Sequence, residues 1–388
     1  MKAIVNGRLI VPDERGIFRV LSGYAILYDK IIRRIVPEAE LSADDRETIA
    51  VLIDAKENFV SPGFINAHIH GAMGFDAMDD DGEAVPAIAR HQASTGVTSF
   101  LPTTMTCPRP AVRRALEHIR AAMKNSCGAR VLGAHMEGPF ISAARCGAQD
   151  AAHILPADFT LIEPFLDVLR IVTFAPEELP ESSDFIERCQ AAGVALSVGH
   201  SAADYETVRR CFAERNVRRV THLFNGMAPF HHRDPGVVGA TLESDADCEL
   251  IADNFHSHPA AHRVLWRAKQ GKNIILITDS MRAAGLGDGE SELGGQTVLV
   301  RNDAATLADG TIAGSLLTMD RAVKNFAENT DCGLPAAVAC ASKTPAESLG
   351  LYGEIGSLSA GKRADFTIFD EDVKIQKTVV GGEIVYES

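Results

Sequence analysis

Short apolar runs alternate with helical patterns through the middle of the chain. The runs, many rich in β-branched residues, occur at 64–70, 97–103, 130–138, 170–177, 195–201, 219–226, 248–256 and 273–280. Between them, segments such as 111–125, 182–193, 203–216 and 259–271 repeat apolar residues at helical spacing. Continuous apolar strands separated by helices predict an α/β fold with a covered parallel sheet. Eight such units favour a (β/α)₈ TIM-like barrel, and the first unit lacks the G-x-G-x-x-G turn of a dinucleotide-binding sheet.

The two ends of the chain have a different pattern. Apolar stretches broken by turn residues, among them Asn6-Gly7, fill the N-terminal part, and similar stretches surround Gly381-Gly382. Because the termini of a domain often meet in space, we predict one small discontinuous β-sandwich domain from residues 1–57 and 352–388. The barrel then spans 58–351, with a β-hairpin insertion near 294–315 where β-prone runs interrupt the helical pattern.

Composition narrows the possible partners. The chain has 388 residues, 46% of them hydrophobic, and a formal net charge of −14, which argues against a nucleic-acid or membrane surface. No apolar run is long enough to cross a membrane, and the N-terminus lacks the apolar core of a signal peptide. The eight cysteines form no C-x-x-C pair, which is typical of reduced thiols. We therefore expect a cytoplasmic protein that binds a small molecule.

Polar residues that can bind metals lie at the ends of five predicted strands. They are His68, His70, Glu137, His200, His222 and Asp279. Catalytic groups of a barrel lie at the C-terminal ends of its strands, and the alternation of a strand points both imidazoles of H-x-H to one side. Burying so many imidazoles and carboxylates is costly unless a cation satisfies them together. A histidine-rich set without cysteine predicts one or two divalent transition metal ions, such as Zn²⁺ or Fe²⁺.

Several motifs occur in a fixed order along nearly the whole chain. They are PGFINAHIHG, HMEGPF, SVGHS, THLFNGM, the TDS that ends the eighth strand, and GKRADFTIFD. Together they resemble the amidohydrolase superfamily and, within it, the N-acetylglucosamine-6-phosphate deacetylase family. The resemblance implies hydrolysis of N-acetyl-D-glucosamine 6-phosphate to glucosamine 6-phosphate and acetate, in amino-sugar catabolism.

The resemblance also implies roles for the residues at the strand ends. Glu137, His200 and His222 match a metal site that the family keeps throughout. His68 and His70 match a second site that only some members have. Asp279 matches the general base that takes a proton from the attacking water and returns it to the leaving amine. A carboxylate near a cation has a lowered pKa, so this base should be ionised.

The phosphate end of the substrate needs contacts away from the metal. Asn225 and Gly226 match the segment that meets the phosphate. Arg233 and His256 match phosphate or sugar contacts that come from the neighbouring subunit in the family, which implies a homodimer with shared active sites. Where many members carry a histidine that binds the substrate carbonyl, this chain has Gln149, which donates a hydrogen bond but carries no charge. N-acetylgalactosamine 6-phosphate therefore stays open as the substrate.

Two other functions are compatible with the scaffold. Cyclic-amide hydrolases of this fold typically bridge two metals with a carboxylated lysine, and this chain offers Glu137 instead. A non-catalytic relative would keep the barrel as an interaction scaffold and usually lose metal ligands, whereas all six are present here.

Overall fold

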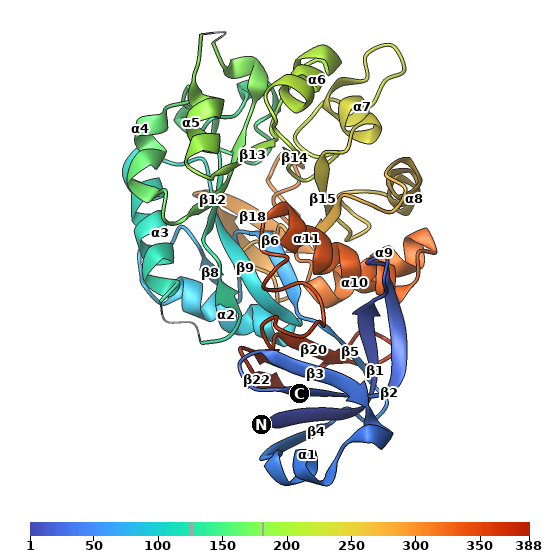
Figure 1. The fold of residues 1–388 in the computed structure, drawn as a ribbon. Helices are drawn as coiled ribbons and strands as arrows, with labels where there is room; N and C mark the ends of the chain where they lie inside the picture. The colour runs from blue at the N-terminus through green and yellow to red at the C-terminus, as the bar shows by residue number, and fades with distance from the viewer. Residues whose placement is uncertain (125–126, 181) are drawn as a thin grey trace.

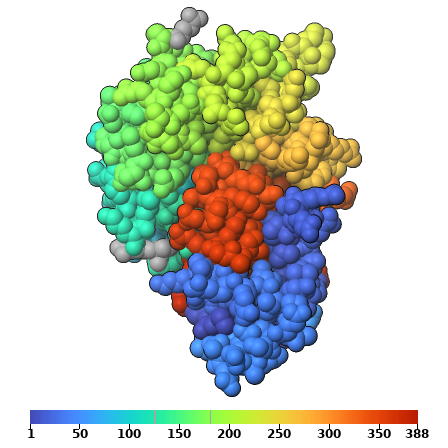
Figure 2. All heavy atoms as spheres, in the orientation of Figure 1, coloured from blue at the N-terminus to red at the C-terminus, as the bar shows by residue number. Residues whose placement is uncertain are grey.

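The barrel and a smaller sheet domain lie side by side, and both termini belong to the smaller domain (Figure 1). This arrangement comes from a computed structural model that describes residues 1–124, 127–180 and 182–388. Helices α10 (Leu334–Ala341) and α11 (Lys343–Ser348) lie between the two parts, in red in the space-filling view (Figure 2). Helix α10 contacts strands of both parts.

Eight parallel strands form the barrel. They are β6 (Phe64–Ile69), β9 (Val97–Thr104), β11 (Ala134–Glu137), β12 (Leu169–Phe174), β13 (Ala195–Val198), β14 (Arg219–Val220), β15 (Asp247–Ile251) and β16 (Ile274–Ile277). The short β10 (Arg130–Val131) pairs with β9 just ahead of β11. The first and last strands join through the Asp279 N–H, which donates to the His68 carbonyl at 2.9 Å. The predicted barrel is confirmed.

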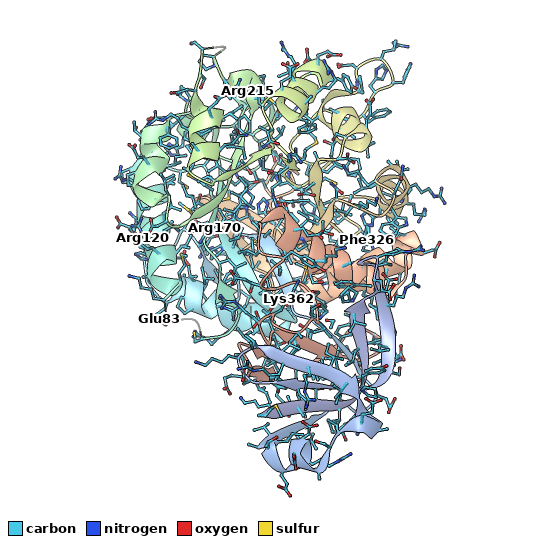
Figure 3. All side chains as sticks on the ribbon, in the orientation of Figure 1. Glu83, Arg120, Arg170, Arg215, Phe326 and Lys362 are labelled. Atoms are coloured by element: carbon cyan, nitrogen blue, oxygen red, sulfur yellow. The ribbon has the colours of Figure 1, made fainter. Side chains whose placement is uncertain are left out.

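The helices cover the outside of the barrel. They are α2 (Ala84–Ser94), α3 (Arg109–Ala122), α4 (Phe159–Ile162), α5 (Phe185–Ala191), α6 (Tyr205–Glu214), α7 (Gly236–Glu243), α8 (Pro259–Ala268) and α9 (Met319–Thr330). Residue 125, the last of the predicted helix 111–125, lies outside the described residues. Helix α6 begins after an N-cap residue, Asp204, whose side chain accepts a hydrogen bond from the Thr207 N–H at 2.8 Å. Helices α8 and α9 pack around Phe326, whose ring lies 5.9 Å from that of Trp266 (Figure 3).

Strands from both chain ends form the smaller domain. The N-terminal part contributes β1 (Lys2–Pro12), β2 (Phe18–Tyr28), β3 (Ile32–Pro37), β4 (Val51–Asp54) and β5 (Phe59–Pro62). The C-terminal part contributes β20 (Phe366–Phe369), β21 (Ile375–Val380) and β22 (Glu383–Glu387). Strand β5 pairs antiparallel with β20 and joins the two ends. The Tyr28 ring meets that of Phe366 edge to face at 5.1 Å, although β1 and β5 separate their strands. The single sheet therefore curls around a shared core. Short α1 (Ala43–Thr48) follows β3.

The insertion after the eighth strand differs from the predicted hairpin. It is a three-stranded antiparallel sheet of β17 (Gly289–Leu293), β18 (Gln296–Arg301) and β19 (Ala304–Thr306). It starts earlier than 294 because Gly294 and Gly295, with φ of 58° and 83°, form its first turn. Its apolar face packs on Met105 and Met281, next to the barrel mouth. A two-stranded ribbon of β7 (Gly71–Ala72) and β8 (Phe75–Asp76) follows β6.

No helix in the described ranges is both long and apolar enough to traverse a lipid bilayer.

Candidate functional site

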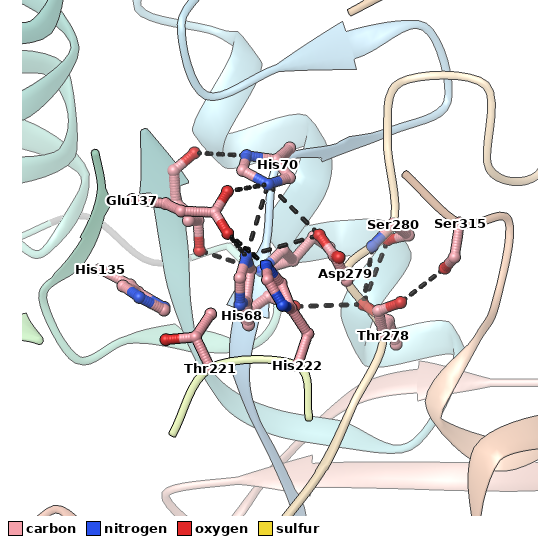
Figure 4. Close-up of polar contacts among 12 residues, drawn as sticks. His68, His70, His135, Glu137, Thr221, His222, Thr278, Asp279, Ser280 and Ser315 are labelled. Atoms are coloured by element: carbon pink, nitrogen blue, oxygen red, sulfur yellow. Dashed lines mark hydrogen bonds and ion pairs between the residues drawn. The ribbon is translucent and has the colours of Figure 1, made fainter. Parts of the chain in front are cut away.

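The six residues predicted as metal ligands meet at the C-terminal mouth of the barrel. Figure 4 labels all of them except His200. Glu137 lies at their centre. Its Oε1 is 2.8 Å from Nε2 of His222 and 3.2 Å from Nε2 of His200. Its Oε2 is 3.2 Å from Nε2 of His70. One carboxylate thus contacts imidazoles from three different segments, as a ligand shared between two metal sites would.

Two groups of ligand atoms overlap at this carboxylate. Glu137, His200 and His222 form one, and His68, His70 and Glu137 form the other; within each, the ligand atoms lie within 4.8 Å of one another. Asp279 stands beside the second group, with Oδ1 3.4 Å from Nε2 of His68 and 3.3 Å from Nε2 of His70. All these side chains are buried.

The imidazoles are held so that their Nε2 atoms face the centre. Nδ1 of His70, His200 and His222 lies 3.2, 2.9 and 3.2 Å from the carbonyl oxygens of Thr103, Arg145 and Asn225. A carbonyl only accepts, so each Nδ1 carries the proton and each Nε2 presents a lone pair, the arrangement of metal-binding histidines. Nε2 atoms of neighbouring imidazoles approach to 3.1 and 3.4 Å. The donor set fits a divalent transition metal.

The charges of the cluster also favour a bound cation. Burial opposes a charged imidazole, yet contacts with Asp279 and Glu137 raise the pKa of His70 to about 9, so a proton competes with a metal ion for its Nε2. Burial also opposes a charged carboxylate, but the surrounding imidazoles hold the pKa of Glu137 well below its usual range. The pKa of Asp279 is lowered against burial by His68 and His70. Two carboxylates therefore stay ionised in the interior and attract positive charge.

Three of these residues share one unusual backbone conformation. His200, His222 and Asp279 have φ of 46°, 29° and 50°, in the left-handed region that non-glycine residues avoid. Each lies two residues beyond the last residue of its strand, β13, β14 or β16. Such strain costs on the order of 1–3 kcal/mol per residue and persists where the surrounding structure requires it. The same local turn brings three side chains from three strands to the barrel axis.

A cavity of about 250 Å³ opens above the cluster. Beside the ligands it is lined by Gln149, Asn225, Gly226 and His256, and by Leu293 of the insertion. His256 lines the cavity of its own chain, which differs from the expectation that it serves a neighbouring subunit. The His256 imidazole is held by Asp253, with Nδ1 2.6 Å from a carboxylate oxygen.

Arg233 lines neither this cavity nor the cluster of ligands beneath it, unlike the other predicted site residues. It is exposed in the loop after Met227, and its Nη1 lies 2.9 Å from Nε2 of His232.

Gln149 makes contacts that the sequence did not predict. Its amide nitrogen donates to Glu137 Oε2 at 2.7 Å, and its amide oxygen accepts from the Thr106 N–H at 2.7 Å. Both polar ends of the side chain are engaged by the protein. Gln149 thus fixes the central carboxylate as well as lining the cavity.

Three buried polar residues below the cluster were missed. Glu249 and Arg219 pair at 2.8 Å, and His135 packs against His68 with ring centroids 4.5 Å apart. The signal was available for Glu249, because a carboxylate inside the apolar run CELIA is rarely buried without a partner. His135 and Arg219 likewise interrupt apolar runs.

A parallel barrel with histidine and carboxylate clusters at its C-terminal mouth defines the class of metal-dependent barrel hydrolases. The chain belongs to the amidohydrolase family, whose model matches residues 59–385. It is 37% identical over 378 residues to the N-acetylglucosamine-6-phosphate deacetylase of Bacillus subtilis strain 168, covering 95% of this chain and 94% of that protein. The resemblance to that deacetylase family is confirmed.

Two further relatives bear on the fold and the substrate. The crystal structure of the N-acetylglucosamine-6-phosphate deacetylase of Thermotoga maritima matches with a TM-score of 0.87 at 32% identity, covering 100% of both chains. The N-acetylgalactosamine-6-phosphate deacetylase of Escherichia coli O157:H7 is 35% identical over 345 residues, covering 87% of this chain and 91% of that protein.

Proposed function

We propose that the protein is a metal-dependent hydrolase that removes the acetyl group from N-acetyl-D-glucosamine 6-phosphate, giving glucosamine 6-phosphate and acetate in amino-sugar catabolism. The observation that carries this proposal is the convergence of Glu137, His200, His222 and Asp279 beneath one cavity. The similarity to deacetylases of this substrate along 95% of the chain supports it.

Glu137, His200 and His222 are proposed to hold one divalent metal, and His68, His70 and Glu137 a second, with Zn²⁺ or Fe²⁺ suited to these donors. When bound, such ions polarise a carbonyl and lower the pKa of water. Asp279 accepts the proton of the attacking water while the oxygen adds to the acetyl carbon. Asp279 then returns this proton to the amine nitrogen as the carbon–nitrogen bond breaks. Its lowered pKa keeps it ionised and ready to accept.

The rest of the cavity is proposed to hold the sugar phosphate. Asn225, Gly226 and His256 line this cavity and are proposed to contact the phosphate or sugar. Gly226 has φ of 61°, and a Cβ there would lie 2.9 Å from Nδ1 of His200, so a side chain does not fit at this position. Gln149, beside Glu137, is proposed to face the acetyl end.

Arg233 is proposed to complete the phosphate site of a second copy in a homodimer. The loop that carries Arg233 also exposes Phe230 by 57%, and Phe255, beside His256, is exposed by 45%. Aromatic and arginine side chains are enriched at protein interfaces, so these exposed residues support a dimer. The molar mass in solution, measured by light scattering, tests the dimer. The eight free thiols support a reducing compartment, and we propose the cytoplasm.

N-acetylgalactosamine 6-phosphate is the second candidate substrate. The 35% identity to a deacetylase of that epimer supports it, as does Gln149 in place of the expected histidine. A cyclic-amide hydrolase is disfavoured, because no lysine is among the residues that line the cavity in the described part of the chain.

Acetate release tests the proposal directly. N-acetylglucosamine 6-phosphate, its galacto epimer and both unphosphorylated sugars are supplied to the zinc-loaded and iron-loaded enzyme. The highest kcat/KM is expected for N-acetylglucosamine 6-phosphate. A higher value for the galacto epimer would favour the second candidate. A protein that binds no transition metal and releases no acetate would favour a scaffold.

A further inference from the structure

We propose that Glu249 and Arg219 act as positioning residues that fix His68 as a metal ligand and so create the second metal site. The inference rests on the metal centre of the proposed function. Glu249 lies on β15 and Arg219 on β14, both below the cluster of ligands. Their exposed fractions are 0% and 2%.

The Glu249 carboxylate sets which nitrogen of His68 carries the proton. Its Oε2 lies 3.0 Å from His68 Nδ1 and can only accept. The proton is therefore on Nδ1, and the lone pair of Nε2 points to Glu137 and Asp279. His68 differs here from the other three imidazoles, whose Nδ1 atoms are held by backbone carbonyls. Only for His68, among these four, does the orientation depend on a side chain.

Arg219 makes it possible to bury this carboxylate. Its Nη2 and Nε donate to Glu249 Oε1 at 2.8 and 3.3 Å, and its Nη1 donates to Ser348 Oγ at 2.5 Å. An isolated buried carboxylate is strongly destabilising, whereas a paired one is tolerated. The planar guanidinium also fixes the plane of the carboxylate. Because the pair is neutral as a whole, it orients His68 without adding net charge beneath the metal.

The same carboxylate contacts the segment of the other metal site. The His222 N–H donates to Glu249 Oε2 at 3.3 Å. The contact is to the backbone, so the His222 imidazole keeps its own partner in the Asn225 carbonyl. Replacing Glu249 should therefore disturb the site of His68 much more than the site of His200 and His222.

A different interpretation is that His68, His135 and Glu249 bind an ion of their own, since their ligand atoms lie within 4.8 Å. Both nitrogens of His135 are engaged, however, by the Ala67 carbonyl at 3.1 Å and by Thr173 Oγ1 at 2.7 Å. Both oxygens of Glu249 are engaged as well. These three side chains form a support below the metal centre.

Counting bound ions tests the proposal without relying on activity. The full-length protein is stripped with a chelator and titrated with Zn²⁺, and the ions per chain are measured by elemental analysis. We expect two ions in the wild type. In Glu249→Gln the amide can donate to His68 Nδ1 and move the proton to Nε2, so we expect one ion. The affinity of the weaker site should fall about 10–100-fold, as for other partners of metal ligands.

Two further variants make the result decisive. Asp365→Asn breaks another buried carboxylate–arginine pair, 2.7 Å from Arg130, and should keep both ions. If Glu249→Gln does not fold, the double variant Glu249→Gln/Arg219→Met removes both charges, leaves none unpaired, and should bind one ion.

Two ions bound with wild-type affinity in the folded Glu249 variant would overturn the proposal, as would a single ion in the wild type. Acetate release is measured separately. A wild type that binds two ions but releases no acetate would overturn the proposed function and not the role of Glu249.

Discussion

Replacing Asp279 by asparagine removes a proton acceptor and leaves the size and shape of the side chain almost unchanged. The carboxylate is buried, with Oδ1 3.3–3.4 Å from two imidazole nitrogens, and its pKa is lowered by their charge. An amide of the same shape can fill the space but cannot take the proton of the attacking water. A positioned general base contributes about 10²–10⁴-fold to the rate. At about 1.4 kcal/mol for each tenfold change, the barrier should rise by about 3–5 kcal/mol.

Steady-state acetate release by Asp279→Asn measures this effect. We expect kcat to fall by about 10²–10⁴-fold, with a much smaller change in KM, because the loss occurs at the transition state. Metal content is measured on the same sample, since the lost negative charge can weaken the neighbouring site. Asp365→Asn is the matched control, because it replaces another buried aspartate, paired with Arg130. A kcat within about tenfold of wild type in a metal-replete Asp279→Asn enzyme would refute its role as the base.

Three other predictions test other parts of the molecule. Gly226→Ala would place a methyl group 2.9 Å from the His200 imidazole, so the variant should lose metal to a chelator faster than the control Gly193→Ala. The two glycines have similar φ (61° and 75°), but a methyl group at Gly193 would have no neighbour within 4 Å. Equal rates of metal loss in the two variants would contradict this prediction. Burial lowers the pKa of His262 to about 4, against about 6.5 in the unfolded chain. Above pH 6.5 the imidazole is neutral in both states. As the pH falls from 6.5 to 4 the unfolded chain takes up the proton first, which lowers the free energy of unfolding by about 3 kcal/mol. Between pH 7 and pH 4 the free energy of unfolding, measured with urea, should fall by about 3 kcal/mol less in His262→Gln than in the wild type. Arg233→Ala should raise KM about 10–100-fold for phosphorylated sugars and leave unphosphorylated ones unchanged, in line with one lost charge-assisted hydrogen bond; equal effects on both would remove Arg233 from the phosphate site.

The barrel was predictable because its strands are buried along their whole length. Every residue of β6, β9, β11 and β16 is buried, which gives the continuous apolar runs seen in the sequence. Helix α7 was not predicted, because GVVGATLE is buried almost all round and shows no helical periodicity. A pattern that depends on a contrast between two faces cannot reveal an element that lacks such a contrast.

The ligands were predictable from their place after the strands, but their supports were not. Glu249 and His68 lie 181 residues apart, and their contact depends on which strands become neighbours across the barrel. Gln149 lies on a loop, so no periodic pattern in the sequence predicts that its amide donates a hydrogen bond to Glu137. Arg233 shows a further limit, because its motif predicted a phosphate contact while its side chain does not line the cavity above the metal ligands.

The pairing of β5 with β20 has a consequence for how the chain folds as it is made. Ser61 and its partner Thr367 are 306 residues apart. At about 5–20 residues per second, roughly 15–60 s pass between synthesis of the first strand and synthesis of the second. The barrel strands up to β16 emerge within that interval. During this interval the edge of β5 that later pairs with β20 has no partner, and an unpaired strand edge can pair with another chain and cause aggregation. The nascent N-terminal sheet is therefore the part of the molecule for which a chaperone, or slow expression at low temperature, should matter most.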